Sequence, residues 1–397
     1  MAKIYSRPRI KLPKACINGD KINKKKLLNL LEIIIIFCIA GGVSKYILDA
    51  VNPIFDTLCE AKSKSMATMI LNEQTNNVMK QYSYEDIFTI ERNNTTNKII
   101  MIKSNTTNIN IITTKIEHPA ILNTCRALES QGFDVTYLNV DKDGLINLKE
   151  LEEAITNKTI LISIMFANNE IGTIEPIEQI GRIAKEHNVL FHTDSVQAIG
   201  NVRIDVNKMN IDLLSMSSHK FYGPKGVGAL YIREGVKCNK LQDGGHQERE
   251  LRAGTENVAG IVGMGKAIEI AYRDFEEYNK KLTSLRNYYI AEIQSKIPNV
   301  KINGGMEHRL PGNANISFKE VDGEELLLGL DNEGICASSG SACSTAQSTP
   351  SHVLLAIGVP SSLAYGALRV TFGEENSKED VDYLIEKLVK TVEKLRN

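Results

Sequence analysis

TILISIMFA (residues 159–167) and NVLFHTDS (residues 188–195) are two short apolar runs, and the helical pattern PIEQIGRIAKEH (residues 176–187) lies between them. Two further runs of the same kind follow, IDLLSMSS (residues 211–218) and GALYIRE (residues 228–234). Short apolar runs bounded by turn residues are candidate strands. Strands that alternate with helices predict βαβ units and a mainly parallel sheet, which is an α/β fold.

The bulk composition is that of a globular protein with room for two or three domains. The chain has 397 residues, 42% of them hydrophobic and 24% charged. Its 47 basic and 48 acidic residues nearly cancel, so nothing in the overall charge favours binding to nucleic acid. The seven cysteines form no C-x-x-C pair and no zinc-ligand spacing, which indicates a reducing cytosol rather than a disulfide framework.

The N-terminal region has the pattern of a membrane anchor. Residues 1–26 form a basic segment, and the apolar run LLNLLEIIIIFCIAGGVSKYIL follows at residues 27–48. A bilayer core needs about 20 mostly apolar residues, so we expect a transmembrane helix here, with its lysine-rich end in the cytoplasm. A buried core helix or an uncleaved signal sequence is the alternative, and Glu32 within the run is the main argument against a span.

Residues 49–112 contain a helical stretch and then short predicted strands around a polar Asn/Thr turn. This segment resembles the start of a YunB-type sporulation membrane protein. The matching positions are Tyr84, Glu85, Asp86, Lys98, Ile99, Met101, Ile102, Asn105, Thr106, Ile109 and Asn110. The resemblance carries no catalytic motif.

Two motifs in the second part of the chain suit a pyridoxal enzyme. SMSSHKFYGPKGVGALY (residues 215–231) places Lys220 between a strand end and a Gly/Pro turn, which suits a Schiff-base lysine. A lysine in a loop is more often simply solvated. Asp194, which ends an earlier strand, can pair with a pyridinium nitrogen, or it can cap a helix.

A third motif is a loop of small residues, ASSGSACSTAQSTPS (residues 337–351), with a single thiol at Cys343. Such a loop cannot pack a core, so we expect it to be mobile and exposed. A mobile thiol can reach a buried substrate and then a partner, although an incidental surface cysteine is the alternative.

Together these motifs resemble an IscS/NifS-type cysteine desulfurase over about residues 113–397. The shared strings include T-T-x-I-E-H-P-A, N-N-E-I-G, H-T-D-x-V-Q-A, S-S-H-K-x-Y-G-P-K-G, Q-E-R-x-L-R-A-G-T-E-N-V and S-S-G-S-A-C-S. The resemblance implies a fold-type-I pyridoxal-phosphate transferase, class V aminotransferase-like, with the N-terminal part of the large domain replaced. Residues 113–262 would form the partial cofactor-binding domain, and residues 263–397 a small domain that carries the cysteine loop.

The resemblance also implies the catalytic roles. Lys220 would hold pyridoxal 5'-phosphate and move the Cα proton, while His118 would stack on the ring and act as an acid–base group. Cys343 would take the sulfur of L-cysteine as a persulfide, releasing L-alanine, and could be a transient iron–sulfur ligand. Arg369 would bind the substrate carboxylate, with Asn169 positioning the substrate and ring.

The remaining implied residues bind the cofactor. Asp194 would pair with the pyridine nitrogen, and Gln197 would bond the phenolic oxygen of the ring. Thr255 would reach the phosphate held by the other subunit of a homodimer. The phosphate itself would be bound by Ser217, Ser218 and His219.

One family element is absent from the sequence before Ile111. Family members carry a phosphate loop of the type F-T-S-G-x-T-E-x-N-N, and the nearest string, IFTIERNNTTN (residues 87–97), lacks its Ser-Gly and Thr-Glu. The chain therefore looks like a fusion joined near residues 108–114. We expect weak cofactor binding, since such a loop supplies backbone N–H groups to the phosphate.

These observations leave three function hypotheses. The first is a cysteine desulfurase that supplies an iron–sulfur scaffold or another sulfur acceptor, with no nucleic-acid partner. The others are an inactive membrane-anchored fusion with a relic desulfurase domain, and a selenocysteine lyase; a transaminase needs no loop thiol. We expect the desulfurase part in the cytoplasm, yet a single span at residues 27–48 would place residues 49–397 outside.

Overall fold

The computed structural model describes residues 88–92, 99–104, 109–238, 240, 242–339 and 350–397. The chain divides into two compact units, Met1–Ala61 and Lys62–Asn397, and every described residue belongs to the second. The predicted membrane run at residues 27–48 and the thiol of Cys343 both lie outside the described residues. No helix within the described part of the chain is long and apolar enough to cross a membrane.

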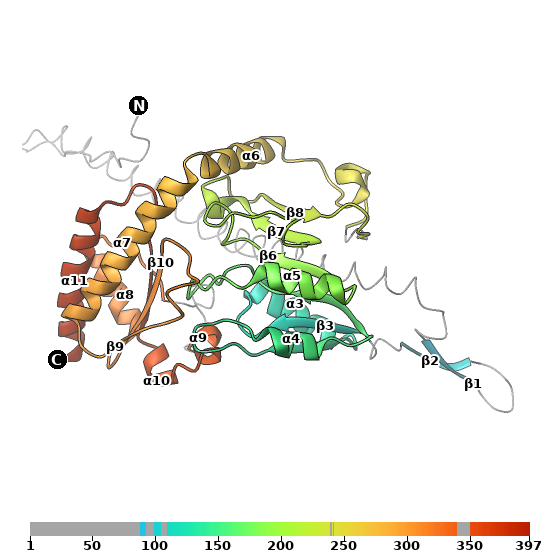
Figure 1. Cartoon of the computed structure of the whole chain (residues 1–397), viewed down its shortest axis with the longest axis horizontal. Coiled ribbons are helices and arrows are strands. Elements are labelled where there is room, and N and C mark those ends of the chain that lie inside the picture. The colour runs from blue at the N-terminus through green and yellow to red at the C-terminus, as the bar shows by residue number, and fades with distance from the viewer. Residues whose placement is uncertain (1–87, 93–98, 105–108, 239, 241, 340–349) are drawn as a thin grey trace, which may run out of the picture. The chain divides into compact units, whose positions relative to one another are not determined.

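A six-stranded sheet with the order β4-β3-β5-β6-β7-β8 forms the larger part (Figure 1). Its first five strands in this order pair in parallel, and β8 pairs antiparallel with β7 at the edge. The predicted α/β fold with a mainly parallel sheet is therefore confirmed. The strands are β3 (Asn110–Thr114), β4 (Asp134–Leu138), β5 (Thr159–Ser163), β6 (Leu190–Asp194), β7 (Leu213–Ser217) and β8 (Gly228–Ile232).

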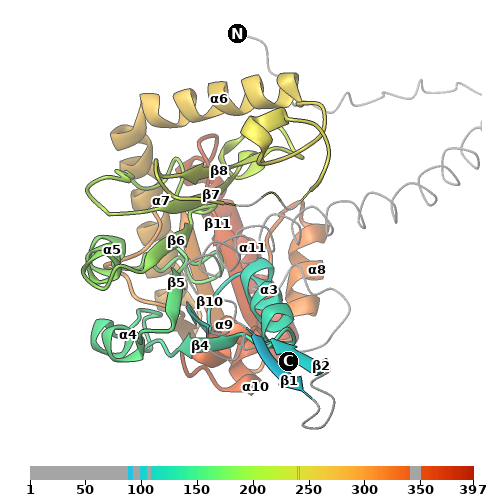
Figure 2. The ribbon, with the colours of Figure 1, turned by 90° about the vertical axis from the view of Figure 1, so that its right-hand side faces the viewer.

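Helices cover both faces of this sheet, with α4 (Leu148–Ala154) and α5 (Ile177–Glu186) on one face and α3 (Pro119–Glu129) on the other (Figure 2). Successive strand residues point to opposite faces. Thus Ile112 joins the core under α4 and α5, while its neighbour Ile111 joins the core under α3. Both faces of the central strands are buried, which explains why their sequences are continuously apolar.

A three-stranded antiparallel sheet of order β11-β10-β9 forms the smaller part. The residues Ser377-Lys378-Glu379-Asp380 have the sequence pattern of a capping box. The capping box is present at the start of α11, whose apolar face is buried from Val381 to Val392. The elements are α7 (Phe275–Lys296), β9 (Val300–Ile302), β10 (Asn313–Phe318), α8 (Gly323–Asn332), α9 (His352–Ala356), α10 (Ser361–Ala364), β11 (Ala367–Thr371) and α11 (Lys378–Arg396).

Two elements run across the boundaries that were drawn on the sequence, and those boundaries stay predictions. Strand β3 begins at Asn110, inside the segment 49–112 that was assigned to a different protein, because its apolar residues complete the core of the large sheet. The boundary expected at 262/263 falls inside α6 (Val258–Arg273), whose Met264 packs into the core of the large sheet. The smaller part of the structure begins after α6, at Phe275, where α7 starts.

Two short strands precede and follow the predicted Asn/Thr turn, whose residues 93–98 lie outside the described residues. Strands β1 (Phe88–Arg92) and β2 (Ile99–Ser104) pair antiparallel, with an irregularity in register between Glu91 and Arg92. Short strands were predicted here from the sequence, and the pairing bears them out.

Candidate active site

Three predicted site residues follow the carboxyl ends of parallel strands of the large sheet. His118 comes after β3, Asp194 ends β6, and Lys220 lies in the short 3-10 helix η2 (Ser218–Phe221) after β7. The carboxyl ends of parallel strands meet at one edge, where α/β proteins bind their ligands. The charges of Asp194 and Lys220 both shift the pKa of His118, which is consistent with all three lying close together.

Asp194 is the half-buried carboxyl group of this cluster. One of its oxygens accepts a hydrogen bond from the backbone N–H of Val196 at 3.0 Å, which closes a turn rather than capping a helix. Burial raises the pKa of Asp194, whereas that hydrogen bond and the charges of His118 and Lys220 lower it. A cationic partner in this pocket would therefore hold the carboxylate in its ionised form.

His118 is the N-cap of α3, and this role decides where its proton lies. Its Nδ1 accepts a hydrogen bond from the backbone N–H of Ala120 at 3.1 Å, so the neutral ring carries its proton on Nε2. Burial lowers the pKa of His118, Asp194 raises it, and Lys220 and His352 lower it further. The neutral ring therefore presents an Nε2–H donor.

Ser217 and Ser218 join the end of β7 to η2, and Ser218 is completely buried. The hydroxyl oxygen of Ser218 has no hydrogen-bond partner among the described residues. A Cβ atom on Gly223 would lie 2.1 Å from that oxygen, so the glycine leaves the hydroxyl its space. A buried hydroxyl without a partner is costly, and this one fits an anionic ligand oxygen.

Three other predicted cofactor residues lie at different degrees of exposure. His219 follows Ser218 in η2, and burial together with the charges of Lys220 and Lys225 lowers its pKa. Gln197 is half-buried in the turn after β6, and its backbone oxygen accepts a hydrogen bond from Asn201. Thr255 is exposed in the loop before α6, so this protomer leaves its side chain open to another molecule.

Arg369 joins the smaller sheet to the loop that follows β5. Its Nη1 donates to the backbone oxygen of Asn169 at 2.7 Å. The backbone of Arg369 also exchanges two hydrogen bonds with Ser338 across an isolated bridge. The structure thus brings together Arg369 and Asn169, the two residues to which the sequence assigned substrate binding.

Two buried glutamates beside these residues were missed on the sequence. Glu117 precedes His118, and one of its carboxyl oxygens accepts from Thr114 and from the backbone N–H of Met165. Burial raises the pKa of Glu117 well above its ordinary value. Glu170 follows Asn169 and accepts a 2.5 Å hydrogen bond from Ser351. The sequence could have indicated these two glutamates, because each stands next to apolar residues in one of the motifs I-E-H-P and N-N-E-I-G.

A polar ladder crosses the three strands that support Asp194. His192 lies between Ser163 on β5, 2.8 Å from its Nδ1, and Ser215 on β7, 2.9 Å from its Nε2. Burial lowers the pKa of His192 to about 3, so the ring is neutral and both contacts are ordinary hydrogen bonds. The ladder ties β5, β6 and β7 together directly below the strand ends.

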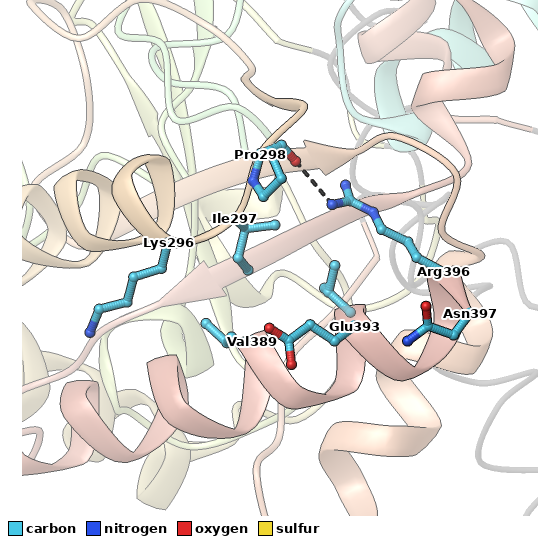
Figure 3. Close-up of a pocket in the computed structure, with 8 residues that line it drawn as sticks. Lys296, Ile297, Pro298, Val389, Glu393, Arg396 and Asn397 are labelled. Carbon is cyan, nitrogen blue, oxygen red and sulfur yellow. Dashed lines mark hydrogen bonds between the residues drawn. The ribbon is translucent and has the colours of Figure 1, made fainter.

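A separate cavity of about 260 Å³ lies between the C-terminal ends of α7 and α11 (Figure 3). Arg396 closes one side by donating to the backbone oxygen of Pro298 at 3.0 Å. The remaining lining residues are Lys296, Ile297, Val389, Val392, Glu393 and Asn397. None of the predicted site residues lines it.

The fold and the cluster at the strand ends are those of a pyridoxal-phosphate enzyme of the class-V aminotransferase type. The family model for aminotransferase class-V matches residues 61–384, which includes most of the segment compared above with a sporulation membrane protein. The chain belongs to this family and, within it, to the cysteine desulfurases.

The curated relatives show this second step. The chain is 59% identical over 288 residues to cysteine desulfurase IscS of Clostridium botulinum (strain Hall), covering 72% of each chain. It is 51% identical over 317 residues to cysteine desulfurase IscS of Dictyoglomus turgidum, covering 79% of this chain and 80% of the relative.

Solved structures agree with this assignment. A NifS-like protein superimposes with a TM-score of 0.71 at 36% identity, covering 83% of this chain and 80% of the other. A structure described as SspA in complex with cysteine has a TM-score of 0.59 at 40% identity, covering 68% and 74%. Enzymes of this class depend on pyridoxal phosphate, and the unsatisfied hydroxyl of Ser218 and the half-buried carboxyl of Asp194 fit that group.

Proposed function

We propose that this protein converts L-cysteine to L-alanine and transfers the sulfur to the thiol of Cys343. The carbon–sulfur bond of the substrate breaks and its electron pair stays with Cβ, which takes up one proton to give alanine. The sulfur leaves to the Cys343 thiolate, where a sulfur–sulfur bond forms and gives the persulfide. The observation that carries the proposal is the hydrogen bond from Arg369 to the backbone oxygen of Asn169. This bond lies at the edge of the sheet where His118, Asp194 and Lys220 follow or end their strands.

Pyridoxal phosphate, when bound, supplies the electron sink that allows the Cα proton to leave and the carbon–sulfur bond to break. The carboxylate of Asp194 would stabilise positive charge on the pyridine nitrogen. The amine of Lys220 would move the Cα proton, and the Nε2–H of His118 would donate toward the substrate. Arg369 would orient the substrate carboxylate through the paired N–H groups of its guanidinium.

The phosphate of the cofactor would lie at Ser217, Ser218 and His219. The support for this is the buried hydroxyl of Ser218, which has no protein partner within the described residues.

We further propose that the enzyme acts as a homodimer. Helix α6 exposes Val258 and Val262 at 66% each and also Ile261 and Ile270 at 44% each, beside the exposed Thr255. An apolar helix face of this kind is typical of an interface, and a second copy covering it would bring its own cofactor site toward Thr255. Sedimentation of the full chain tests this; a monomer at all concentrations would contradict it.

The sulfur acceptor would be an iron–sulfur scaffold or a similar protein in the cytoplasm. The membrane anchor at residues 27–48 and the fusion to a sporulation-type segment stay proposals from the sequence. Fractionation with protease protection tests the anchor, and full-length protein recovered without detergent would rule it out.

The experiment for the central proposal is a turnover assay on the full chain with added pyridoxal phosphate. We expect L-alanine to appear and the peptide that contains Cys343 to gain the mass of one sulfur atom. Selenocysteine as the far better substrate would favour a selenocysteine lyase. Folded protein that takes up cofactor but produces no alanine would favour the relic domain.

A further inference from the structure

A buried hydrogen bond links the Asn169 loop to the start of α9. The hydroxyl of Ser351 donates to Oε2 of Glu170 at 2.5 Å and accepts from the backbone N–H groups of Val353 and Leu354. Glu170 and Ser351 are 4% and 5% exposed. The carboxyl group of Glu170 therefore holds the N-cap of α9, although the two residues are 181 positions apart in the chain.

The next residue of α9 makes a second contact of the same kind. Nε2 of His352 donates to the backbone oxygen of Glu117 at 3.0 Å, and Glu117 directly precedes His118. The apolar side of α9 packs with Ile116 and Ile171. The start of α9 is therefore attached to both loops that carry predicted site residues.

The other described end of the Cys343 segment is attached to the same place. Ser338 pairs with the backbone of Arg369, and the guanidinium of Arg369 donates to the oxygen of Asn169. The backbone oxygen of Glu170 accepts from two buried amides of β10, Asn313 and Asn315. Ser338 and Ser351 flank Cys343 in the sequence. Ser338 is linked to Asn169 through Arg369, and Ser351 is hydrogen-bonded to Glu170, so both are attached to the same loop.

Resting on the desulfurase activity proposed above, we propose that Glu170 is a positioning residue for sulfur transfer. By holding Ser351, its carboxyl group fixes the chain that follows the Cys343 segment against the loop that carries Asn169. Glu170 does not contact the substrate in this role and acts through Ser351.

The charge of Glu170 supports a role beyond simple packing. Burial raises the pKa of Glu170 to about 7, while the Ser351 hydrogen bond and the charge of Arg369 lower it. The charged group that faces it comes from β11, as Arg369; β10 presents neutral amides, and His352 on α9 points to the oxygen of Glu117. Because the raised pKa means that the buried, attached state favours the protonated carboxyl, the contribution of Glu170 to this state is present at low pH and is lost as pH rises through 7.

The test compares Glu170→Ala and Glu170→Gln with a matched control, Glu175→Gln. Glu175 is also a buried carboxyl with a raised pKa in the same loop region, but it bonds to the backbone N–H of Ile146 and not to α9. Two readouts are measured for each variant: hydrogen-exchange protection of the Val353 and Leu354 amides in the cofactor-free full chain, and kcat and KM for L-cysteine.

We expect Glu170→Ala to lose about tenfold in the protection of both amides and about tenfold in kcat, the equivalent of one hydrogen bond to a charged group. The KM should change by less than about threefold, because Arg369 is held independently by the oxygen of Asn169. The protection of both amides in the wild type should fall relative to that in Glu170→Gln as pH rises through 7, because the neutral amide of Gln leaves no charge to bury. Glu175→Gln should match the wild type in both readouts.

Three results would overturn the inference. Unchanged protection and kcat in Glu170→Ala would show that the contact does not matter, and a raised KM with unchanged kcat would place Glu170 in substrate binding. Equal losses in Glu175→Gln would reduce the effect to general stability. If Glu170→Ala does not fold, the pH comparison with Glu170→Gln decides. A wild-type chain that releases no alanine refutes the proposed function, and the exchange data still report on the attachment.

Discussion

The substitution Gly223→Ala should weaken cofactor binding through a single hydroxyl group. A Cβ atom at this position would lie 2.1 Å from the Ser218 hydroxyl oxygen, 3.0 Å from the Ser218 backbone oxygen and 3.2 Å from Cβ of Ala267. Backbone and helix close two sides, so the part that can move is the Ser218 hydroxyl. The added methyl group should therefore turn that hydroxyl away from the phosphate.

The size of the effect follows from the interaction that is lost. A hydrogen bond to a charged group contributes about 1.5–3 kcal/mol, and each 1.4 kcal/mol is about a tenfold change in affinity. The dissociation constant of pyridoxal phosphate should thus rise by about 10- to 150-fold. The added methyl group can also disturb the surrounding structure, so circular dichroism is recorded to verify that the variant is folded.

The assay is titration of cofactor-free protein with pyridoxal phosphate, followed by absorbance and by equilibrium dialysis. Gly265→Ala is the control, because nothing lies within 4 Å of the added Cβ, and it should bind with wild-type affinity. Ser218→Ala should show the same loss as Gly223→Ala. The double variant should lose no more than either single variant, because both act on one hydroxyl group.

Two results would refute this reasoning. Wild-type affinity in Gly223→Ala would mean that the Ser218 hydroxyl does not bind the phosphate or that the methyl group is accommodated elsewhere. Additive losses in the double variant would mean that Gly223 acts on the site by a route other than Ser218.

Three further predictions concern the reaction, the buried charge and the replaced N-terminal region. Lys220→Ala should abolish the absorbance of bound cofactor, whereas Cys343→Ala should keep it and stop alanine release; equal loss of both signals in Cys343→Ala would reject the separate roles. Burial raises the pKa of Glu175 to about 8 from its ordinary 4.5, so ionising this group destabilises the folded state increasingly as pH rises between these values. The unfolding free energy of Glu175→Gln should therefore rise relative to that of the wild type by up to about 5 kcal/mol across that pH window. If urea unfolding gives the same difference between the two proteins at every pH, the prediction is wrong. The full chain should bind pyridoxal phosphate at least about a thousandfold more weakly than a relative with the phosphate loop, since two or three charged hydrogen bonds are missing; protein that stays yellow through dialysis would contradict it.

The amino-acid sequence determined the class of fold and supplied the site residues that we propose. Alternating apolar runs and helical patterns are local features with fixed periods, and they led to the correct strands from β5 to β8. The capping box at Ser377 and the buried face of α11 were equally local. Lys220 and Asp194 could be found because each stands in a short motif at the end of its own strand.

The tertiary structure decided which of these local pieces meet. The elements β3 and α6 run across the predicted boundaries, because apolar residues on either side of each boundary pack into one core. The tautomer of His118 depends on a helix N-cap, and the space around the Ser218 hydroxyl depends on a glycine. The bond from Ser351 to Glu170 joins positions 181 residues apart. No periodicity records such a contact, because the fold alone brings the two groups together in a buried place, where a hydrogen bond is stronger than in water.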